Sequence, residues 1–251
     1  MNHRSVVRLP WERRGPGSEE ALVQRLGGTL ALHLTGAVSP EVCARWSAGV
    51  EEARPHWNRD FDGEQFSLGR AWYTHLEQGR SHTYFAQARA SDELVERFAP
   101  GLQAGVLALL SALVGHEVGR RAGWCGPGVH VFPGGREVAR EGGVIHSDVE
   151  GLSAAHIAER VPALSAVLML RPPERGGGLR LWDAHHLEAT ALDEESLDDV
   201  ASETLAYCPG DLVVFDSYRL HQIQAFSGRL DRLSVTAHAV RLGPGRWEAW
   251  F

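Results

Sequence analysis

The stretch that decides the fold reads Gly143-Val-Ile-His146-Ser-Asp148. A β-branched approach leads into it, and His146 and Asp148 stand two positions apart. On an extended chain their side chains therefore point to the same face. Imidazole and carboxylate together suit a divalent first-row metal. The stretch predicts two metal ligands, with a strand over residues 144–146 leading into them.

His221 is the best candidate for a third ligand. It comes after the turn Pro209-Gly-Asp211 and the apolar run Leu212–Phe215, and it lies in a second apolar segment, Leu220–Ile223. Two imidazoles and one carboxylate form a facial triad that leaves three coordination positions of non-haem Fe(II) open. The long gap in sequence is expected, because ligands on neighbouring strands of a barrel need not be close along the chain.

A third pattern runs from Arg232 to His238, where polar and apolar residues alternate. Alternation predicts a strand with Arg232, Ser234, Thr236 and His238 on one face. The planar guanidinium binds a carboxylate through two parallel hydrogen bonds, and a serine hydroxyl two positions later adds a donor. Arg232 and Ser234 are therefore predicted to hold an organic acid beside the metal.

These residues resemble the Fe(II)- and 2-oxoglutarate-dependent oxygenase superfamily, whose pattern is His-x-Asp, a distant His and then Arg-x-Ser. Here eleven positions separate His221 from Arg232, and the likeness covers roughly residues 124–242. The resemblance implies that Fe(II) is held by two histidines and one aspartate, and that the distal carboxylate of 2-oxoglutarate is bound by an arginine and a serine. The implied residues are His146, Asp148 and His221 for iron, and Arg232 and Ser234 for 2-oxoglutarate.

The resemblance also implies the reaction. With O2, 2-oxoglutarate is decarboxylated to succinate while a C–H bond of the substrate is oxidised, and hydroxylation is the default outcome. The carboxylate of Asp148 disfavours halogenation, because related halogenases have Gly or Ala at that position. Desaturation, ring closure and epimerisation stay open.

Short strands separated by turns dominate from Trp124 onward. Without alternating helices, such a pattern favours an antiparallel sandwich or barrel. The resemblance sharpens this to a double-stranded β-helix, a cupin-like jelly roll that is mostly β, with helices packed on one sheet. The expected strands are Val129–Phe132, Val144–His146, Leu164–Leu170, Leu179–Trp182, Asp211–Phe215, Leu220–Gln224 and Arg232–Arg241.

We expect one domain over residues 1–251, with a flexible arm at 1–18, a helical and loop part at 19–123 and the jelly-roll core at 124–242. Within the middle part, Leu22–Leu34 indicates a short helix and a strand.

Ser39-Pro40 indicates the start of another helix, with Cys43, Trp46 and Val50 on its packed side. Loops and short elements are expected over 54–90, one long helix from Ser91 to about Val114, and a solvated helix or loop over the acidic stretch 193–203.

Composition narrows the class of partner. A net charge of −7 argues against nucleic acid, since phosphate binding needs clustered positive charge. The most apolar segment, Gly101–Gly115, is too short to cross a bilayer, and no secretory leader is visible at the N-terminus, so no membrane is expected. Three widely spaced cysteines, Cys43, Cys125 and Cys208, fit a reducing cytoplasmic setting.

We therefore expect a small metabolite as substrate, such as an amino acid, a peptide-like molecule or a natural-product intermediate. Candidate pocket residues are Trp124, His130, Trp182, Arg70 and Tyr73, with core packing or surface solvation as the alternative for each. Two alternative functions stay open. One is a cupin-like metalloenzyme that does not use 2-oxoglutarate, and the other is a non-catalytic jelly-roll binding module.

Overall fold

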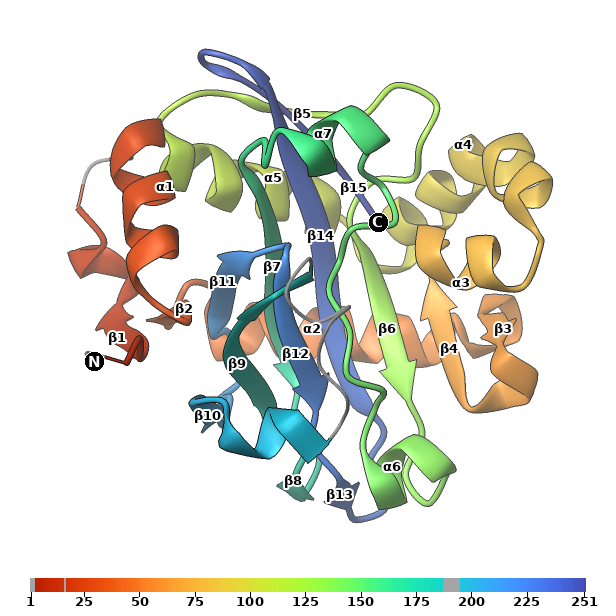
Figure 1. Ribbon diagram of the computed structural model, residues 1–251. Helices are drawn as coiled ribbons and strands as arrows, with labels where there is room; N and C mark the ends of the chain where they lie inside the picture. Colours follow the sequence, from red (N-terminus) through yellow and green to blue (C-terminus); the bar gives the residue numbers. More distant parts are fainter. Residues whose placement is uncertain (1–2, 16, 187–194) are drawn as a thin grey trace.

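The computed structural model describes residues 3–15, 17–186 and 195–251, and these form two facing sheets with helices behind the larger one (Figure 1). The larger sheet has ten strands. Its main path is β1 (Val6–Pro10), β2 (Ala31–Thr35), β11 (Leu212–Asp216), β7 (Ala163–Arg171), β14 (Arg232–Gly243), β6 (Gly128–Phe132), β4 (Gln65–Leu68) and β3 (Asn58–Asp60). Strand β15 (Arg246–Trp250) pairs with β14, and β5 (Val118–Arg120) pairs with β15.

The smaller sheet lies in front of β7 and β14 in Figure 1. Its order is β10 (Ser202–Leu205), β9 (Leu179–His185) and β12 (Arg219–Ile223). A two-stranded ribbon of β8 (Arg175–Gly176) and β13 (Phe226–Ser227) continues beside it. Residues from β9, β12 and β14 meet in the space between the two sheets, which positions the site.

Helices cover the large sheet and connect its strands. They are α1 (Glu19–Gly28), α2 (Pro40–Glu52), α3 (Trp72–Glu77), α4 (Ser81–Phe98), α5 (Leu102–Val114), α6 (Glu137–Glu141) and α7 (Ala154–Ala158). Short 3-10 helices are η1 (Trp11–Arg13), η2 (Arg54–His56), η3 (Phe61–Gly63) and η4 (Glu195–Asp199). The predicted start of α2 is confirmed, since the Ser39 hydroxyl accepts a hydrogen bond from Val42 N and Pro40 is the first helical residue.

The main hydrophobic core lies between the large sheet and the helices behind it. Cys43, Trp46 and Val50 of α2 and the apolar face of α5 pack against the sheet side chains. Alternation in β14 places Leu233, Val235 and Ala237 in this core. Arg232, Ser234 and Thr236 therefore face the opposite sheet, as the sequence predicted.

The expected flexible arm at residues 1–18 is wrong for the part that the structure describes. Residues 6–10 form β1, which pairs in parallel with β2, and Val6 is buried. Glu203 of β10 accepts a hydrogen bond from Val6 N and forms an ion pair with Arg8. The edge of β2 offers unpaired backbone groups, and this short segment covers them.

The single helix expected from Ser91 to Val114 is also wrong. Helix α4 begins ten residues earlier, at Ser81, and ends at Phe98, and α5 begins at Leu102 after a bend of 97°. Pro100 disfavours a helical residue before it, and Gly101 adopts a left-handed φ of 75°. The break folds α5 back under the sheet.

The part before residue 124 is not confined to helices and loops. Strands β1, β2, β3 and β4 all join the large sheet, and β15 extends it beyond residue 242. Of the acidic stretch 193–203, residues 193 and 194 lie outside the described residues, η4 follows, and Ser202 and Glu203 begin β10. The helix and strand expected within Leu22–Leu34 are confirmed as α1 and β2. The other strands were not predicted, because each is short and its alternation is brief.

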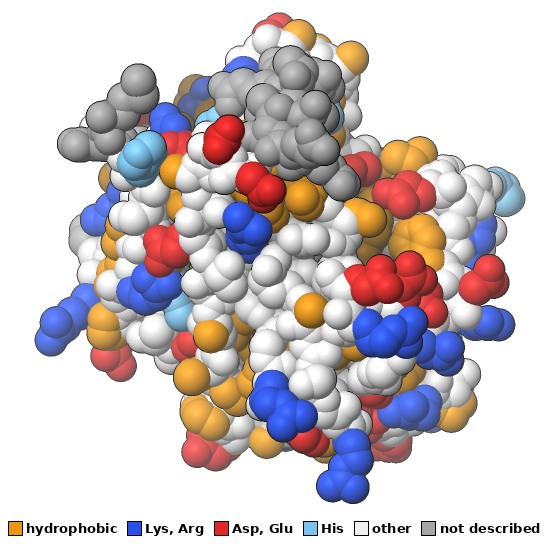
Figure 2. Space-filling model, turned by 60° about the horizontal axis from the view of Figure 1, so that its bottom comes forward, with side chains coloured by type: hydrophobic (Ala, Val, Ile, Leu, Met, Phe, Trp, Pro, Cys, Tyr) orange, Lys and Arg blue, Asp and Glu red, His pale blue; other side chains and the backbone are white. Residues whose placement is uncertain are grey.

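Within the described residues, no single helix has the length and apolar character needed to span a membrane, although α4 and α5 together pass that test as a bent pair. On the face shown in Figure 2, acidic and basic side chains are interspersed with apolar ones.

Candidate metal centre

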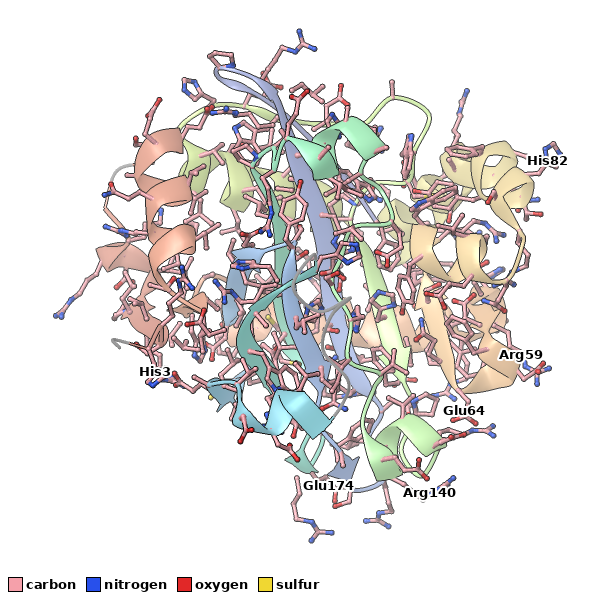
Figure 3. The ribbon with its side chains drawn as sticks, viewed as in Figure 1. His3, Arg59, Glu64, His82, Arg140 and Glu174 are labelled. Atoms are coloured by element: carbon pink, nitrogen blue, oxygen red, sulfur yellow. The ribbon has the colours of Figure 1, made fainter. Side chains whose placement is uncertain are left out.

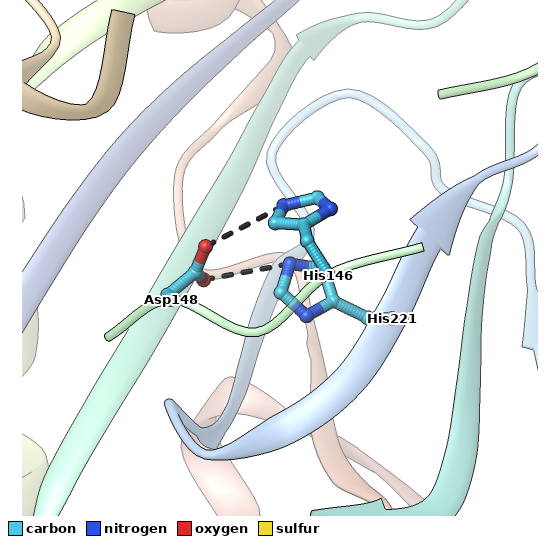
Figure 4. A group of neighbouring side chains, drawn as sticks. All are labelled: His146, Asp148 and His221. Atoms are coloured by element: carbon cyan, nitrogen blue, oxygen red, sulfur yellow. Dashed lines mark ion pairs between the residues drawn. The ribbon is translucent and has the colours of Figure 1, made fainter. Parts of the chain in front are cut away.

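Three predicted ligands meet between the two sheets. His146 Nε2 lies 3.6 Å from Asp148 Oδ1, and His221 Nε2 lies 3.5 Å from Asp148 Oδ2 (Figure 4). One possible ligand atom from each residue lies within 4.8 Å of the others. Two imidazole nitrogens and one carboxylate oxygen at this spacing fit a single first-row divalent metal ion.

The approach to His146 differs from the expected strand. His146 forms an isolated bridge with His221, through hydrogen bonds of 3.1 and 2.9 Å between their backbones. Gly143 N donates to Ile223 O. Between these two contacts the chain advances three residues from Gly143 to His146, while β12 advances only two from His221 to Ile223. The extra residue forms a bulge, which leaves Val144 79% exposed. The bulge, rather than simple alternation, sets the direction of His146.

Backbone carbonyls fix the tautomer of both histidines. His146 Nδ1 lies 2.9 Å from Val144 O, and His221 Nδ1 lies 3.0 Å from Arg219 O. A carbonyl oxygen only accepts, so each Nδ1 must carry the proton and donate it. Both Nε2 lone pairs are then free to bind a metal, which is the usual arrangement around metal-ligating histidines.

The charge state of the group also suits a cation. Burial lowers the pKa of His221 to about 4, although the charge of Asp148 opposes this, so its imidazole is neutral at pH 7. Burial acts to raise the pKa of Asp148, but the neighbouring His221, His238 and His146 outweigh it and lower that pKa. A neutral imidazole beside an ionised carboxylate is the protonation state that metal binding requires.

Arg232 and Ser234 also lie in the space between the sheets. Arg232 is 1% exposed, and its Nη1 donates to Ser234 Oγ at 2.9 Å. Its Nε donates to Gly177 O at 3.3 Å. Burial lowers the Arg232 pKa, and among the described residues no carboxylate forms an ion pair with it. A buried cation left unpaired is costly, so the surroundings of Arg232 fit an organic anion.

Tyr207 lies next to Arg232 and was missed by the sequence analysis. The guanidinium carbon lies 5.6 Å from the centre of its ring. Its hydroxyl is buried and makes no hydrogen bond of good geometry to a described residue. Burial raises the pKa of Tyr207 to about 12, so the hydroxyl keeps its proton and is available as a donor. No spacing rule links Tyr207 to Arg232, and only the packing of β14 against the chain before β11 brings them together.

A cavity of about 420 Å³ contains both groups. Its lining includes the three candidate ligands, Arg232, Ser234 and Tyr207, and it is otherwise mainly aromatic and aliphatic. The apolar part of the lining lowers the local dielectric constant and so strengthens electrostatic interactions beside it. The arrangement can therefore hold a metal ion and an organic acid side by side, with room for another small molecule.

His238 is a second residue without a role in the sequence analysis. It follows Ser234 on the same face of β14, and its Nδ1 lies 3.1 Å from Ser165 Oγ and 3.6 Å from Asp148 Oδ2. Ser165 in turn lies 3.0 Å from Ser217 Oγ. This network surrounds the carboxylate of Asp148 and limits its rotation. The alternation in β14 did predict its face, but not its neighbours.

The predicted pocket residues divide into two groups. Tyr73 and His130 line the cavity. Trp182 lies on the outer side of β9, in a cluster with Leu197 and Leu220, because Leu181 takes the inward position. It therefore packs in the outer core and does not line the cavity.

The other two candidates also lie elsewhere. Trp124 packs against Trp72 and Trp250, with ring centres 4.9 and 5.9 Å apart. Arg70 forms hydrogen bonds with His75 and Gln87. Neither residue lines the cavity. Their positions agree with packing and surface bonding as the alternative to substrate contact.

Comparison with known proteins finds solved structures of the same fold. No family model matches the chain, and no curated protein matches it. Among solved structures, the epimerase SnoN in complex with Fe3+, alpha ketoglutarate and nogalamycin RO superposes with a TM-score of 0.59 at 18% identity, over 88% of this chain and 85% of that one.

Two further structures agree. An N-substituted L-amino acid dioxygenase from Burkholderia ambifaria AMMD, in complex with alpha-KG, gives a TM-score of 0.57 at 14% identity, over 92% of this chain and 90% of that one. The alpha ketoglutarate dependent carbocyclase SnoK from nogalamycin biosynthesis gives 0.52 at 17% identity, over 94% and 100%. The chain therefore has the jelly-roll fold of the non-haem iron, 2-oxoglutarate-dependent oxygenases, which confirms the expected fold.

Proposed function

We propose that this protein is an Fe(II)- and 2-oxoglutarate-dependent oxygenase that oxidises a small metabolite. One observation carries the proposal. A His-Asp-His group of ligand geometry and a buried arginine without a carboxylate partner among the described residues line one cavity. A metal alone would explain the triad, and an anion alone would explain Arg232. An organic acid that also chelates the metal explains both.

The roles follow from the geometry of the chain. His146, His221 and Asp148 would hold Fe(II) through two Nε2 atoms and a carboxylate oxygen. Bound Fe(II), 2-oxoglutarate and O2 would supply the oxidation, with succinate and CO2 as coproducts. Arg232 and Ser234 would bind the distal carboxylate and so orient the cosubstrate toward the metal, with the Tyr207 hydroxyl as an additional donor.

The cavity supports a small-molecule substrate, because its volume matches that of ordinary ligand pockets. Hydroxylation of a C–H bond is the default outcome for such a site, and natural-product biosynthesis is the setting that two of the compared enzymes share. The three cysteines form no disulfide, which supports a reducing, cytoplasmic setting.

Anaerobic titration tests the proposal. The purified apoprotein is loaded with Fe(II) and then titrated with 2-oxoglutarate, and we expect a visible metal-to-ligand charge-transfer band that saturates at one equivalent of each. In His146→Ala and Asp148→Ala the band should be absent, since the metal is lost. His82→Ala, at an exposed position (Figure 3), is the matched control and should keep the band.

Two results would count against the proposal. Fe(II) binding without any band on addition of 2-oxoglutarate would favour the cupin-like alternative. Failure to retain Fe(II) would favour a non-catalytic binding module. Substrate screening then follows succinate release, and turnover with a macromolecule alone would contradict the small-metabolite assignment.

A further inference from the structure

One wall of the cavity is made of aromatic rings, and it ends at Phe132, whose ring centre lies 5.7 Å from the Arg232 guanidinium carbon. Phe61 stacks on Tyr73 with ring centres 6.4 Å apart, and Tyr73 lies 5.6 Å from the ring of His130. His130 in turn lies 5.7 Å from the ring of Phe132. All four residues line the cavity. The faces of phenyl and phenol rings attract cations and apolar groups, and they offer nothing to an anion.

The backbone conformation at Phe61 is unfavourable, which indicates that the position of its ring in this wall is functional. Phe61 and Asp62 have φ values of 46° and 53°, a conformation that is unfavourable for a bulky side chain. Phe61 N donates to the side-chain oxygen of Gln78, which holds the turn in place. The strained turn directs the Phe61 ring into the cavity, and strain of this kind concentrates at ligand sites.

Three carboxylates line the same cavity. Glu64 follows the strained turn, Glu77 ends α3, and Glu150 lies two residues after Asp148. None of the ion pairs between described residues includes any of the three. Glu64 accepts one hydrogen bond, from Glu137 N at 2.8 Å, and Figure 3 shows it between β4 and α6. A positively charged group in the cavity could therefore pair with carboxylates that have no cationic partner among the described residues.

The positive charge of Arg232 lies at the Phe132 end of the aromatic wall. Arg232 is the single arginine among the described residues that line it, and the chain contains no lysine. Under the proposed function, 2-oxoglutarate neutralises Arg232. The remaining space is then lined by carboxyl groups and aromatic rings.

A buried, unpartnered polar side chain also faces this space. His130 is 6% exposed and lines the cavity, while its strand neighbours Val129 and Val131 point into the helix-side core. Its Nδ1 has no hydrogen-bond partner among the described residues. A neutral imidazole can accept a hydrogen bond from an N–H group of a ligand.

We infer that the substrate carries a protonated amine on an apolar or aromatic body, with the ammonium group held by Glu64, Glu77 and Glu150 and the body packed against Phe61 and Tyr73. This rests on the proposed function, because it assigns Arg232 to the cosubstrate. A substrate that carries a carboxylate, a phosphate or another anion in this part of the cavity should bind weakly.

A matched set of three probes tests the inference. Phenethylamine, 2-phenylethanol and 3-phenylpropionate share a phenyl ring on a short chain and differ in charge. Binding is measured by calorimetry, both to the apoprotein and to the anaerobic protein with Fe(II) and 2-oxoglutarate. In the loaded protein we expect phenethylamine to bind about tenfold more tightly than the alcohol, with the propionate weakest, and added salt should reduce this preference.

Variants locate the binding group. Glu64→Gln and Glu77→Gln should each weaken phenethylamine binding by about threefold to tenfold and leave 2-phenylethanol unchanged, since only a charged partner is lost. Glu150 is left intact because of its closeness to Asp148. Glu174→Gln, at an exposed position outside the cavity (Figure 3), removes the same charge from the protein and should change neither.

Other outcomes would overturn the inference. These are equal binding of the three probes, tighter binding of the alcohol or propionate, no binding of any probe, or an amine preference that survives both substitutions. The charge-transfer band recorded in the same samples separates the two proposals. If the charge-transfer band forms but phenethylamine is not preferred, only this inference is wrong. If phenethylamine is preferred but no band forms, only the proposed function is wrong.

Discussion

At the scale of single residues, Arg232 has the most constrained surroundings. Its guanidinium is buried between the rings of Phe132 and Tyr207, with Ser234 Oγ and Gly177 O as acceptors. Those neutral acceptors do not balance its charge. A carboxylate in the cavity would do so and would use the planar geometry of the guanidinium.

Substitution of Arg232 should therefore weaken cosubstrate binding far more than metal binding. In Arg232→Ala, we expect the Kd for 2-oxoglutarate to rise by about 10- to 100-fold, since a charged hydrogen bond contributes about 1.5–3 kcal/mol. Arg232→Lys should recover little, because an ammonium cannot donate two parallel hydrogen bonds. Anaerobic titration checks both. Arg229→Ala, at an exposed position, is the control, and an unchanged Kd in Arg232→Ala would contradict the assignment.

Tyr207→Phe separates a ligand contact from a structural one. Without 2-oxoglutarate, removal of a buried hydroxyl that makes no hydrogen bond of good geometry to the described residues should leave the free energy of unfolding unchanged or slightly raised. With 2-oxoglutarate, the Kd should rise by about 2- to 10-fold through loss of one donor. Urea unfolding and the same titration measure the two effects. A clear loss of stability in the apoprotein would show that the hydroxyl bonds within the protein instead.

At the scale of elements, close backbone contacts set how the helices pack behind the sheet. A Cβ atom built on Gly49 of α2 would lie 1.7 Å from the carbonyl oxygen of Phe98, at the end of α4. That oxygen belongs to the backbone and cannot rotate away. The absence of a side chain at residue 49 thus lets α2 lie against both α4 and β7.

Two glycine substitutions should have opposite effects on stability. Gly49→Ala should lower the free energy of unfolding by about 1–3 kcal/mol or more, because α2 must move away from α4. Gly27→Ala, in α1, should raise it by up to about 1 kcal/mol, since no atom lies within 4 Å of the new Cβ and alanine favours a helix. Urea denaturation compares them. Equal effects would show that the contact with Phe98 is not what requires glycine.

At the scale of the whole molecule, buried histidines make the apoprotein sensitive to acid. Burial lowers the pKa of His130 to about 3 and that of His221 to about 4, and it also lowers the pKa of His75 and of His238. As the pH falls through 6.5, these histidines take up protons in the unfolded chain but stay neutral in the folded chain. Stability is therefore complete above pH 6.5 and declines toward the folded-state values.

The pH slope of stability tests this account. In the presence of a chelator, the free energy of unfolding should fall between pH 6.5 and 4.5, by up to about 1.4 kcal/mol per pH unit for each such histidine. His130→Phe should reduce the slope by about 1.4 kcal/mol per pH unit, which corresponds to one proton. His82→Phe, at an exposed position, is the matched control. A slope in His130→Phe equal to that of the native chain would mean that His130 titrates normally when folded.

Local patterns in the sequence predicted several features correctly. Alternation in residues 232–238 assigned each side chain of β14 to its face, and Ser39-Pro40 marked the start of α2. Features that depend on partners were not predicted. The bulge before His146 arises from its pairing with β12, and β1 is a strand because β2 offers an open edge.

The sequence by itself determined which residue types are available for chemistry and which faces of their strands they occupy, because side-chain chemistry and the period of a strand are local properties. Tertiary structure alone decided that Asp148 lies between two Nε2 atoms, that Arg232 is buried beside Tyr207, and that carboxylates and aromatic rings surround the remaining space. Burial and charge pairing arise between positions far apart in the chain, and these set the desolvation and electrostatic energies on which binding depends.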